Sequence, residues 1–278
     1  MTAPTAGSLR VNGATLHYEV RGQGPLLLLI PGGTGGAASF DDVADDLATD
    51  FTVAAYDPRG MSRSTLDDPE AEQSVAEHAD DAFRLLELLS PDRPARVFGA
   101  SSGAIVALHL LTARPGRVER VVAHEPPAVM VLPDAAEHRE LLARVRRTYR
   151  TQGLVPAMTV FAAGLNEGGD STAAEAEIEL PPQAAARAER TMGDLPYFVG
   201  RIVPGFMSYT PDVNRLASLA DRLVLAGGQD SRGELTYRPA ALLAERLGVP
   251  LLHFPGGHIG LTTHAAEFGE LLRKALRD

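Results

Sequence analysis

A serine between two glycines is the residue of this sequence best placed to act as a nucleophile. Ser101 is the central residue of the stretch Gly99-Ala100-Ser101-Ser102-Gly103, a G-x-S-x-G pattern. Where this pattern joins a strand to a helix, the tight turn exposes the serine hydroxyl at the carboxyl end of the sheet. The pattern alone is a weak indicator, because glycine and serine are common in ordinary turns. Its meaning depends on the partners that the rest of the chain offers.

A serine hydroxyl is a poor nucleophile at neutral pH unless a base removes its proton, so a histidine is required. His258 lies in a Gly-rich turn after a late predicted strand, where a side chain can reach over the carboxyl edge of a sheet. His264, at the start of the last predicted helix, is the weaker rival. Five more histidines are predicted to be structural: His17 and His253 in strands, His109 inside a helix, and His78 and His138 on helix surfaces.

The histidine needs a carboxylate that fixes its tautomer and stabilises the imidazolium. Two positions qualify. Glu125 ends the strand that follows the serine-bearing helix, and Asp230 follows a later strand and precedes His258 in the chain. Both are predicted to point into the same cleft, so the residues alone leave the choice open.

A glycine-rich loop after an apolar strand offers groups that could stabilise negative charge. The loop is Pro31-Gly32-Gly33-Thr34-Gly35-Gly36, and the strand is Leu26 to Ile30. A backbone N–H that no Cβ shields can approach a developing oxyanion, and Gly33 is the first choice of donor.

The same loop has a second interpretation, as a dinucleotide-binding turn. Gly33, Gly35 and Ala38 fit G-x-G-x-x-A, and Asp57 ends the next strand near the position of a ribose-binding acid. The loop is wide and contains Pro31, and Asp57 runs on into a further turn, so nucleotide binding is the less favoured interpretation.

The elements that would position these residues alternate between strand and helix. The Asn12-Gly13 turn predicts an antiparallel hairpin at the start of the chain. Apolar runs then predict strands at 26–30, 51–56, 96–98, 118–123, 221–226 and 250–254, with helical patterns between them. This alternation predicts a mostly parallel, doubly wound α/β sheet covered by helices on both faces.

Residues 128–214 interrupt the alternation. They show no convincing strand, and their helical pieces are broken by prolines. We therefore predict an α/β core formed by residues 1–127 and 215–278, with residues 128–214 inserted as a helical cap.

Composition excludes several classes of function. The chain has no cysteine, so disulfides and thiolate catalysis are excluded, and its net charge of −10 disfavours nucleic acid as a partner. The start lacks a basic segment followed by an apolar one, and the longest apolar run is too short to cross a bilayer, so we expect a cytoplasmic protein without membrane contact. The clustered arginines at helical spacing are expected to form a solvent-exposed face: Arg144, Arg146, Arg147 and Arg150.

Three features together resemble the α/β-hydrolase superfamily: the Gly-rich loop, the GASSG turn and the late PGGHIG stretch. Within it, the combination of YDPRGMSRS, GASSG and HEPP is similar to the bacterial and fungal branch that contains the zearalenone-type lactone hydrolases. The resemblance implies an α/β-hydrolase fold with a helical cap. It also implies Glu125 as the triad acid in preference to Asp230, and the N–H groups of Gly33 and Ser102 as the oxyanion donors.

One departure from that branch concerns the substrate pocket. The described pocket of the branch uses an aromatic wall from the cap, whereas this chain has no tryptophan, so substrate identity is not carried over. Near the site, we expect Asp57 and Arg59 to form a structural salt bridge, and Met61 and Ser62 to face the pocket.

The predicted activity is that of a serine hydrolase that cleaves a carboxylic ester or lactone through an acyl-enzyme on Ser101, with a resorcylic macrolactone such as zearalenone among the candidates. A cofactor-free perhydrolase or haloperoxidase and a non-catalytic small-molecule receptor are the alternatives. Epoxide hydrolases and dehalogenases are disfavoured because they carry Asp at the elbow. The chemistry requires no metal or organic cofactor, the expected partner is a small ester or lactone, and a homo-oligomer stays open.

Overall fold

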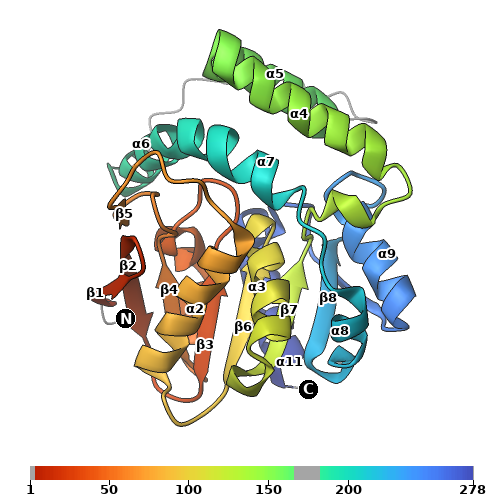
Figure 1. Cartoon of the computed structure of the whole chain (residues 1–278). Helices are drawn as coiled ribbons and strands as arrows, with labels where there is room; N and C mark the ends of the chain where they lie inside the picture. Colours follow the sequence, from red (N-terminus) through yellow and green to blue (C-terminus); the bar gives the residue numbers. More distant parts are fainter. Residues whose placement is uncertain (1–3, 166–181, 278) are drawn as a thin grey trace.

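The computed structural model describes residues 4–165 and 182–277. Its central sheet has the strand order β1-β2-β4-β3-β6-β7-β8-β9, with β5 paired to β2 (Figure 1). The strands are β1 Thr5–Val11, β2 Ala14–Arg21, β3 Leu26–Ile30, β4 Thr52–Tyr56, β5 Thr65–Leu66, β6 Ala95–Ala100, β7 Val118–His124, β8 Leu223–Gly228 and β9 Leu251–Phe254. Pairing is antiparallel where β2 meets β1, β4 and β5, and parallel from β4 to β9. The predicted hairpin and the mostly parallel sheet are both present.

The sheet separates two hydrophobic cores, and β3 contributes to both. Leu28 and Ile30 pack into the core shared with α2 and α3, whereas Leu27 and Leu29 pack into the core shared with α1 and α11. Successive side chains of a strand point to opposite faces, so a strand covered on both sides is apolar throughout, as the LLLLI sequence predicts.

Helices cover both faces of the sheet. The helices on and around the sheet are α1 Asp41–Leu47, α2 Val75–Leu89, α3 Ser102–Ala113, α8 Val213–Ala217, α9 Tyr237–Leu247, α10 Gly260–Thr263 and α11 Ala265–Arg277. Short 3₁₀ turns occur at η1 Ala37–Phe40, η2 Pro115–Arg117, η3 Val129–Val131 and η5 Ala220–Arg222. In Figure 1, α2, α3 and α8 lie in front of the sheet and α11 lies behind it. This arrangement is the fold class predicted from the sequence.

A further group of helices lies over the carboxyl end of the sheet (Figure 1). They are α4 Ala135–Gln152, α5 Leu154–Leu165, α6 Pro182–Tyr197, the π-helical η4 Phe198–Ile202 and α7 Val203–Phe206. The arginines of α4 that were predicted to face solvent are all exposed: Arg144, Arg146, Arg147 and Arg150. We refer to these five helical elements as the cap helices. The division of the chain into core and cap at residues 128 and 214 stays a prediction.

Two histidines predicted to lie on helix surfaces are buried. His78 on α2 packs edge-on against Phe206 of α7, with 4.8 Å between ring centroids. His138 on α4 lies 3.3 Å from Asp134. Helical periodicity separates the sheet-facing side of α2 from its other side, but it does not reveal that a distant helix covers that other side. Within residues 4–165 and 182–277, the structure has no helix with the length and apolar character that crossing a membrane requires.

Candidate active site

Ser101 occupies a strained turn between β6 and α3. Its backbone angles are φ 52° and ψ −122°, a combination that a residue with a side chain rarely adopts. The flanking glycines are required by close packing: a Cβ on Gly99 would lie 2.4 Å from the Gly103 carbonyl oxygen, and one on Gly103 would lie 2.3 Å from the Ile30 carbonyl oxygen. The turn is fastened to the next strand by the Ser101 N–H, which donates to the His124 carbonyl oxygen at 2.9 Å.

Three side chains chosen from the sequence lie in a chain of hydrogen bonds. The Ser101 Oγ is 3.1 Å from Nε2 of His258, and Nδ1 of His258 is 2.6 Å from Oε2 of Glu125. Ser101 lies in the β6–α3 turn, His258 in the loop after β9, and Glu125 at the end of β7. A carboxylate at Nδ1 places the ring proton on that nitrogen, which leaves Nε2 free to accept the serine proton.

Glu125 is fully buried, and its carboxylate has several hydrogen-bond donors. Oε1 accepts from the Gly228 N–H at 2.8 Å and from the Ser231 hydroxyl, and Oε2 accepts from the Thr236 hydroxyl at 3.1 Å. Burial alone would raise the pKa of Glu125, but the hydrogen bonds from His258 and Ser231 favour the charged form and lower the pKa to about 2. Glu125 is therefore ionised at neutral pH.

Sequence reasoning missed the donors Ser231 and Thr236. Ser231 directly follows Asp230, and a hydroxyl next to a candidate acid was the available signal. Asp230 itself has an exposed side chain, and its N–H donates to the Gly256 carbonyl oxygen at 3.0 Å. His264, the rival base, is also exposed and lies 2.9 Å from the Thr263 hydroxyl. The contact with His258 is thus made by Glu125.

The Gly-rich loop presses against the serine turn. A Cβ on Gly32 would lie 2.3 Å from the Ala100 carbonyl oxygen and 2.6 Å from Cβ of Ser101. Gly33 has φ +61°, and its N–H donates to the hydroxyl of Ser102 at 3.1 Å. The two predicted oxyanion donors therefore belong to residues in direct contact. The contact through the Ser102 side chain was not anticipated.

The predicted Asp57–Arg59 salt bridge is wrong, because each residue has another partner. Asp57 accepts from Nε of Arg63 at 2.7 Å, and Arg59 donates from Nε and Nη2 to Asp81 on α2, both at 2.6 Å. Arg59 lies in a tight turn, in which the Met61 N–H donates to the Pro58 carbonyl oxygen at 3.0 Å, and its side chain reaches α2.

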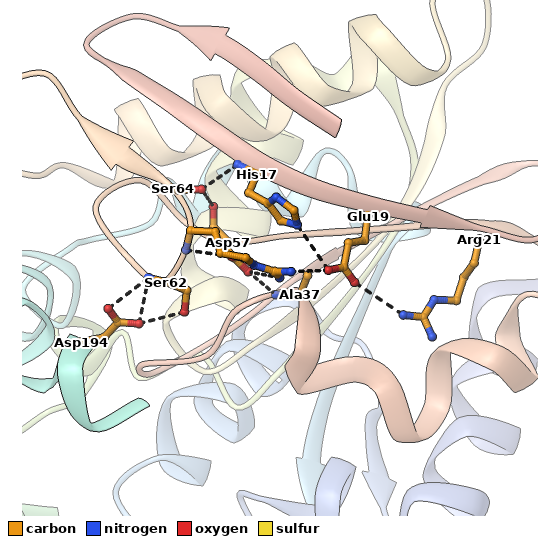
Figure 2. A network of polar contacts seen from close by, with 9 residues as sticks. His17, Glu19, Arg21, Ala37, Asp57, Ser62, Ser64 and Asp194 are labelled. Carbon is orange, nitrogen blue, oxygen red and sulfur yellow. Dashed lines mark hydrogen bonds and ion pairs between the residues drawn. The ribbon is translucent and has the colours of Figure 1, made fainter. Parts of the chain in front are cut away.

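The environment of Asp57 also bears on nucleotide binding. Its side chain is fully buried and accepts the Ala37 N–H at 2.8 Å (Figure 2). It also accepts from the Arg63 guanidinium. Both carboxylate oxygens are used inside the protein, so Asp57 offers none to a ribose.

Met61 and Ser62 do not line the main cavity. Met61 is buried in the core, and Ser62 binds a residue of the cap helices. The Ser62 N–H lies 3.0 and 3.1 Å from the two carboxylate oxygens of Asp194 on α6, and the Ser62 hydroxyl donates to Asp194 at 3.0 Å (Figure 2). Burial raises the pKa of Asp194, against the lowering effect of the Ser62 hydrogen bonds. No local pattern in the sequence pointed to this contact.

A cavity of about 430 Å³ opens on Ser101 and His258. The cap helices supply an apolar wall that includes Phe161, Phe198 and Phe206. Phe161 and Phe198 pack edge-on, with 6.4 Å between ring centroids. An aromatic wall is therefore present in a chain without tryptophan. Within residues 4–165 and 182–277, no group of three or more potential metal ligands is assembled.

Comparison with known proteins identifies the family. The sequence matches the family described as alpha/beta hydrolase fold over residues 25–232. The chain belongs to the alpha/beta hydrolase family.

Two relatives and one solved structure are similar to this alpha/beta hydrolase over nearly its whole length. It is 35% identical to the uncharacterized hydrolase YraK of Bacillus subtilis (strain 168), over 97% of this chain and 95% of that protein. It is 27% identical to a zearalenone hydrolase of Cladophialophora bantiana, over 97% of this chain and 95% of that protein. The enol-lactonase of Burkholderia xenovorans LB400 shares the fold, with a TM-score of 0.72 and 18% identity over 98% of this chain and all of that one. The protein is thus a hydrolase that resembles the zearalenone hydrolase branch.

Proposed function

We propose that this alpha/beta hydrolase cleaves a carboxylic ester or lactone through an acyl-enzyme on Ser101. The observation that carries the proposal is the hydrogen-bonded chain from Ser101 Oγ through His258 to Glu125 at the floor of an apolar cavity. The same chain supplies a nucleophile, a base and a carboxylate that stabilises the protonated base.

In the first half of the proposed reaction, Ser101 Oγ attacks the carbonyl carbon while its proton passes to Nε2 of His258. The carbonyl π electrons move to oxygen, and the N–H groups of Ser102 and Gly33 stabilise the oxyanion. To do so, the Gly33 N–H exchanges its hydrogen bond to the Ser102 hydroxyl for one to the oxyanion. The oxyanion collapses, the bond to the alkoxide breaks, and His258 gives its proton to the departing oxygen. In a lactone, that alcohol stays attached to the acyl chain.

In the second half, His258 takes a proton from water as the water oxygen attacks the acyl carbon. The second tetrahedral intermediate collapses, a carboxylic acid is released, and the proton returns to Ser101. Every step uses groups of this chain, water and the substrate.

The proposed substrate class includes macrolactones of the zearalenone type. Two arguments support it: the similarity to a zearalenone hydrolase over 97% of the chain, and a cavity of about 430 Å³ with an aromatic wall. Clefts that bind drug-sized ligands have volumes of roughly 300 to 1,000 Å³. We further propose that the cap helices form this substrate-binding wall and that the partner is a small molecule. The cytoplasmic location stays a prediction.

The experiment uses purified protein with 4-nitrophenyl butanoate, zearalenone and a fluorophosphonate probe. We expect release of nitrophenolate and a covalent adduct on Ser101 that peptide mass spectrometry locates. Ser101→Ala should lose both, with kcat lower by about 10⁴-fold or more. Absence of turnover together with absence of label on Ser101 in the wild type would overturn the proposal. Tight binding of zearalenone without hydrolysis would instead favour a receptor.

A further inference from the structure

The charges in and around the cavity limit which esters can reach Ser101. We propose that the substrate of this hydrolase is uncharged, and that the cavity rejects esters and lactones whose acyl or alcohol part carries a carboxylate. The inference rests on the proposed function, and it narrows the substrate class by charge.

Among the described residues, the lining of the cavity includes no lysine or arginine that could pair with an anionic substituent. Phenylalanines of the cap helices form one side, and the core adds apolar residues such as Pro127 and Leu261. The polar side chains of the lining are hydroxyls, among them Thr34, Thr191 and Thr236, apart from His258. Among the described residues that line the cavity, His258 is the only one with a titratable side chain. A carboxylate moved from water into such a site loses its hydration and gains no cation.

Two guanidinium groups, those of Arg63 and Arg190, line a small cavity next to the main one. The two cavities share Thr34, Ser39 and Thr191. Arg63 donates to Asp57 at 2.7 Å and also to Glu19. Its charge is therefore already matched by two carboxylates.

Arg190 faces a carboxylate as well. It interacts electrostatically with Asp194, which lies one helical turn further along α6 and is itself held by Ser62. The guanidiniums of Arg63 and Arg190 thus already face the carboxylates of Asp57, Glu19 and Asp194, and Glu19 also pairs with Arg21 at 3.7 Å. An anionic substrate would have to displace an existing ion pair in order to gain a cation.

The Glu125 carboxylate, which binds Nδ1 of His258, is a further negative charge next to the cavity. Glu125 is fully buried, and the donors to its carboxylate are His258, Ser231, Thr236 and the Gly228 N–H. None of these donors is a lysine or an arginine. A carboxylate-bearing substrate in the cavity would meet this charge in surroundings of low dielectric, where repulsion is stronger than in water.

The test compares three 4-nitrophenyl esters that differ at the far end of one acyl chain. The hexanoate ends in a methyl group, the methyl adipate ends in a neutral methyl ester, and the monoadipate ends in a carboxylate. We expect kcat/KM of the first two to agree within about tenfold, and that of the monoadipate to be at least 100-fold below the methyl adipate. The neutral polar ester separates the effect of charge from that of polarity. A monoadipate value within tenfold of the methyl adipate would overturn the inference.

Salt distinguishes the cavity from the overall charge of the chain. Exposed charges are largely screened at 0.5 M NaCl, whereas buried ones are not. We expect the discrimination to persist at 0.5 M NaCl. If it disappears there, it arises from the net charge of −10 and the inference fails.

A designed cation provides the matched variant. Thr191→Arg places a guanidinium on the cavity wall, and Thr191→Met places an uncharged side chain of similar length there. We expect the ratio of monoadipate to methyl adipate turnover to rise at least tenfold in Thr191→Arg relative to Thr191→Met. Each variant is its own reference, so a general loss of activity leaves the ratio readable. An unchanged ratio would argue against charge as the cause.

Binding to Ser101→Ala separates this inference from the proposed function. The intact methyl adipate and monoadipate esters are titrated calorimetrically into Ser101→Ala, and we expect the neutral ester to bind at least 100-fold more tightly. If wild type turns over neither ester while Ser101→Ala still prefers the neutral one, the proposed function fails and the charge inference stands. Equal binding of the two esters overturns the charge inference alone.

Discussion

At the scale of single residues, the site depends on how completely the Glu125 carboxylate is hydrogen-bonded. The Gly228 N–H, two hydroxyls and His258 donate to its two oxygens, and no solvent reaches the side chain. A carboxylate with this many donors stays ionised in spite of burial, and it fixes which nitrogen of His258 carries the proton. Asp230, the other candidate acid, has an exposed side chain.

Substitution of the two acids tests their roles. We expect Glu125→Gln to lower kcat by about 10² to 10⁴-fold, because an amide retains the packing but not the charge that stabilises the imidazolium. Asp230→Asn should leave kcat within about threefold, since its side chain is exposed. Steady-state kinetics with 4-nitrophenyl butanoate measure both. A mild effect of Glu125→Gln together with loss of turnover in Asp230→Asn would reverse the assignment.

At the scale of elements, the Gly-rich loop and the β6–α3 turn are packed backbone against backbone. Gly32 has no room for a side chain, whereas an added Cβ on Gly33 would have no neighbour within 4 Å. The two adjacent glycines are therefore required for different reasons, the first for close approach and the second for its φ of +61°.

This difference gives a matched pair of variants. Gly32→Ala should push the loop away from Ser101, lower kcat by about 10²-fold as an oxyanion donor moves out of position, and lower Tm. Gly33→Ala adds only backbone strain of about 1 to 2 kcal/mol, so its kcat should fall less than that of Gly32→Ala. Thermal denaturation and kinetics on both proteins provide the comparison. Equal losses of kcat would contradict the packing argument.

A second contact between elements joins α6 to the loop after β4. Asp194 holds Ser62, and Thr191 on the same helix lines the cavity. We expect Asp194→Ala to raise KM by about three- to tenfold with a smaller effect on kcat, because the helix that shapes the cavity loses its attachment. Asp221→Ala, at an exposed aspartate far along the chain, is the control. A fall in kcat with KM unchanged would show that Asp194 acts in another way.

At the scale of the whole molecule, stability in acid should report on Glu125. Its pKa in the folded protein is about 2, below the ordinary 4.5. A depressed pKa contributes stability that is fully present above about pH 4.5 and is lost as the pH falls toward 2. The contribution changes by at most about 1.4 kcal/mol per pH unit.

The comparison is between wild type and Glu125→Gln, whose amide does not titrate. We expect the wild type to lose more unfolding free energy than the variant between pH 5 and pH 3. Urea denaturation at several pH values measures this difference. If the free-energy gap between the two proteins is constant with pH, the hydrogen bonds do not hold the pKa of Glu125 low.

Local patterns predicted much of this molecule, and long-range packing accounts for the rest. The Asn12-Gly13 hairpin, the fully apolar β3 and the glycines around Ser101 each depend on a few neighbouring residues, and each is where the sequence indicated. The sequence also singled out Ser101 and His258, and the family resemblance favoured Glu125 over Asp230; His258 contacts both Ser101 and Glu125. By contrast, the partner of Arg59 lies 22 residues away on α2, and Asp194 lies 132 residues from Ser62. No periodicity encodes such pairings, and the buried His78 was missed for the same reason.

The backbone angles at three positions have a consequence for evolution in the laboratory. Ser62, Ser101 and Glu125 have φ values of 50°, 52° and 46°, which glycine adopts without strain. The backbone strain at each position costs about 1 to 3 kcal/mol of stability, which a glycine there would relieve. A population selected for heat resistance alone, with no demand for turnover, should therefore accumulate glycine at position 101, and Ser101→Gly should melt at a higher temperature than Ser101→Ala. The serine survives only in lineages where the reaction itself is under selection.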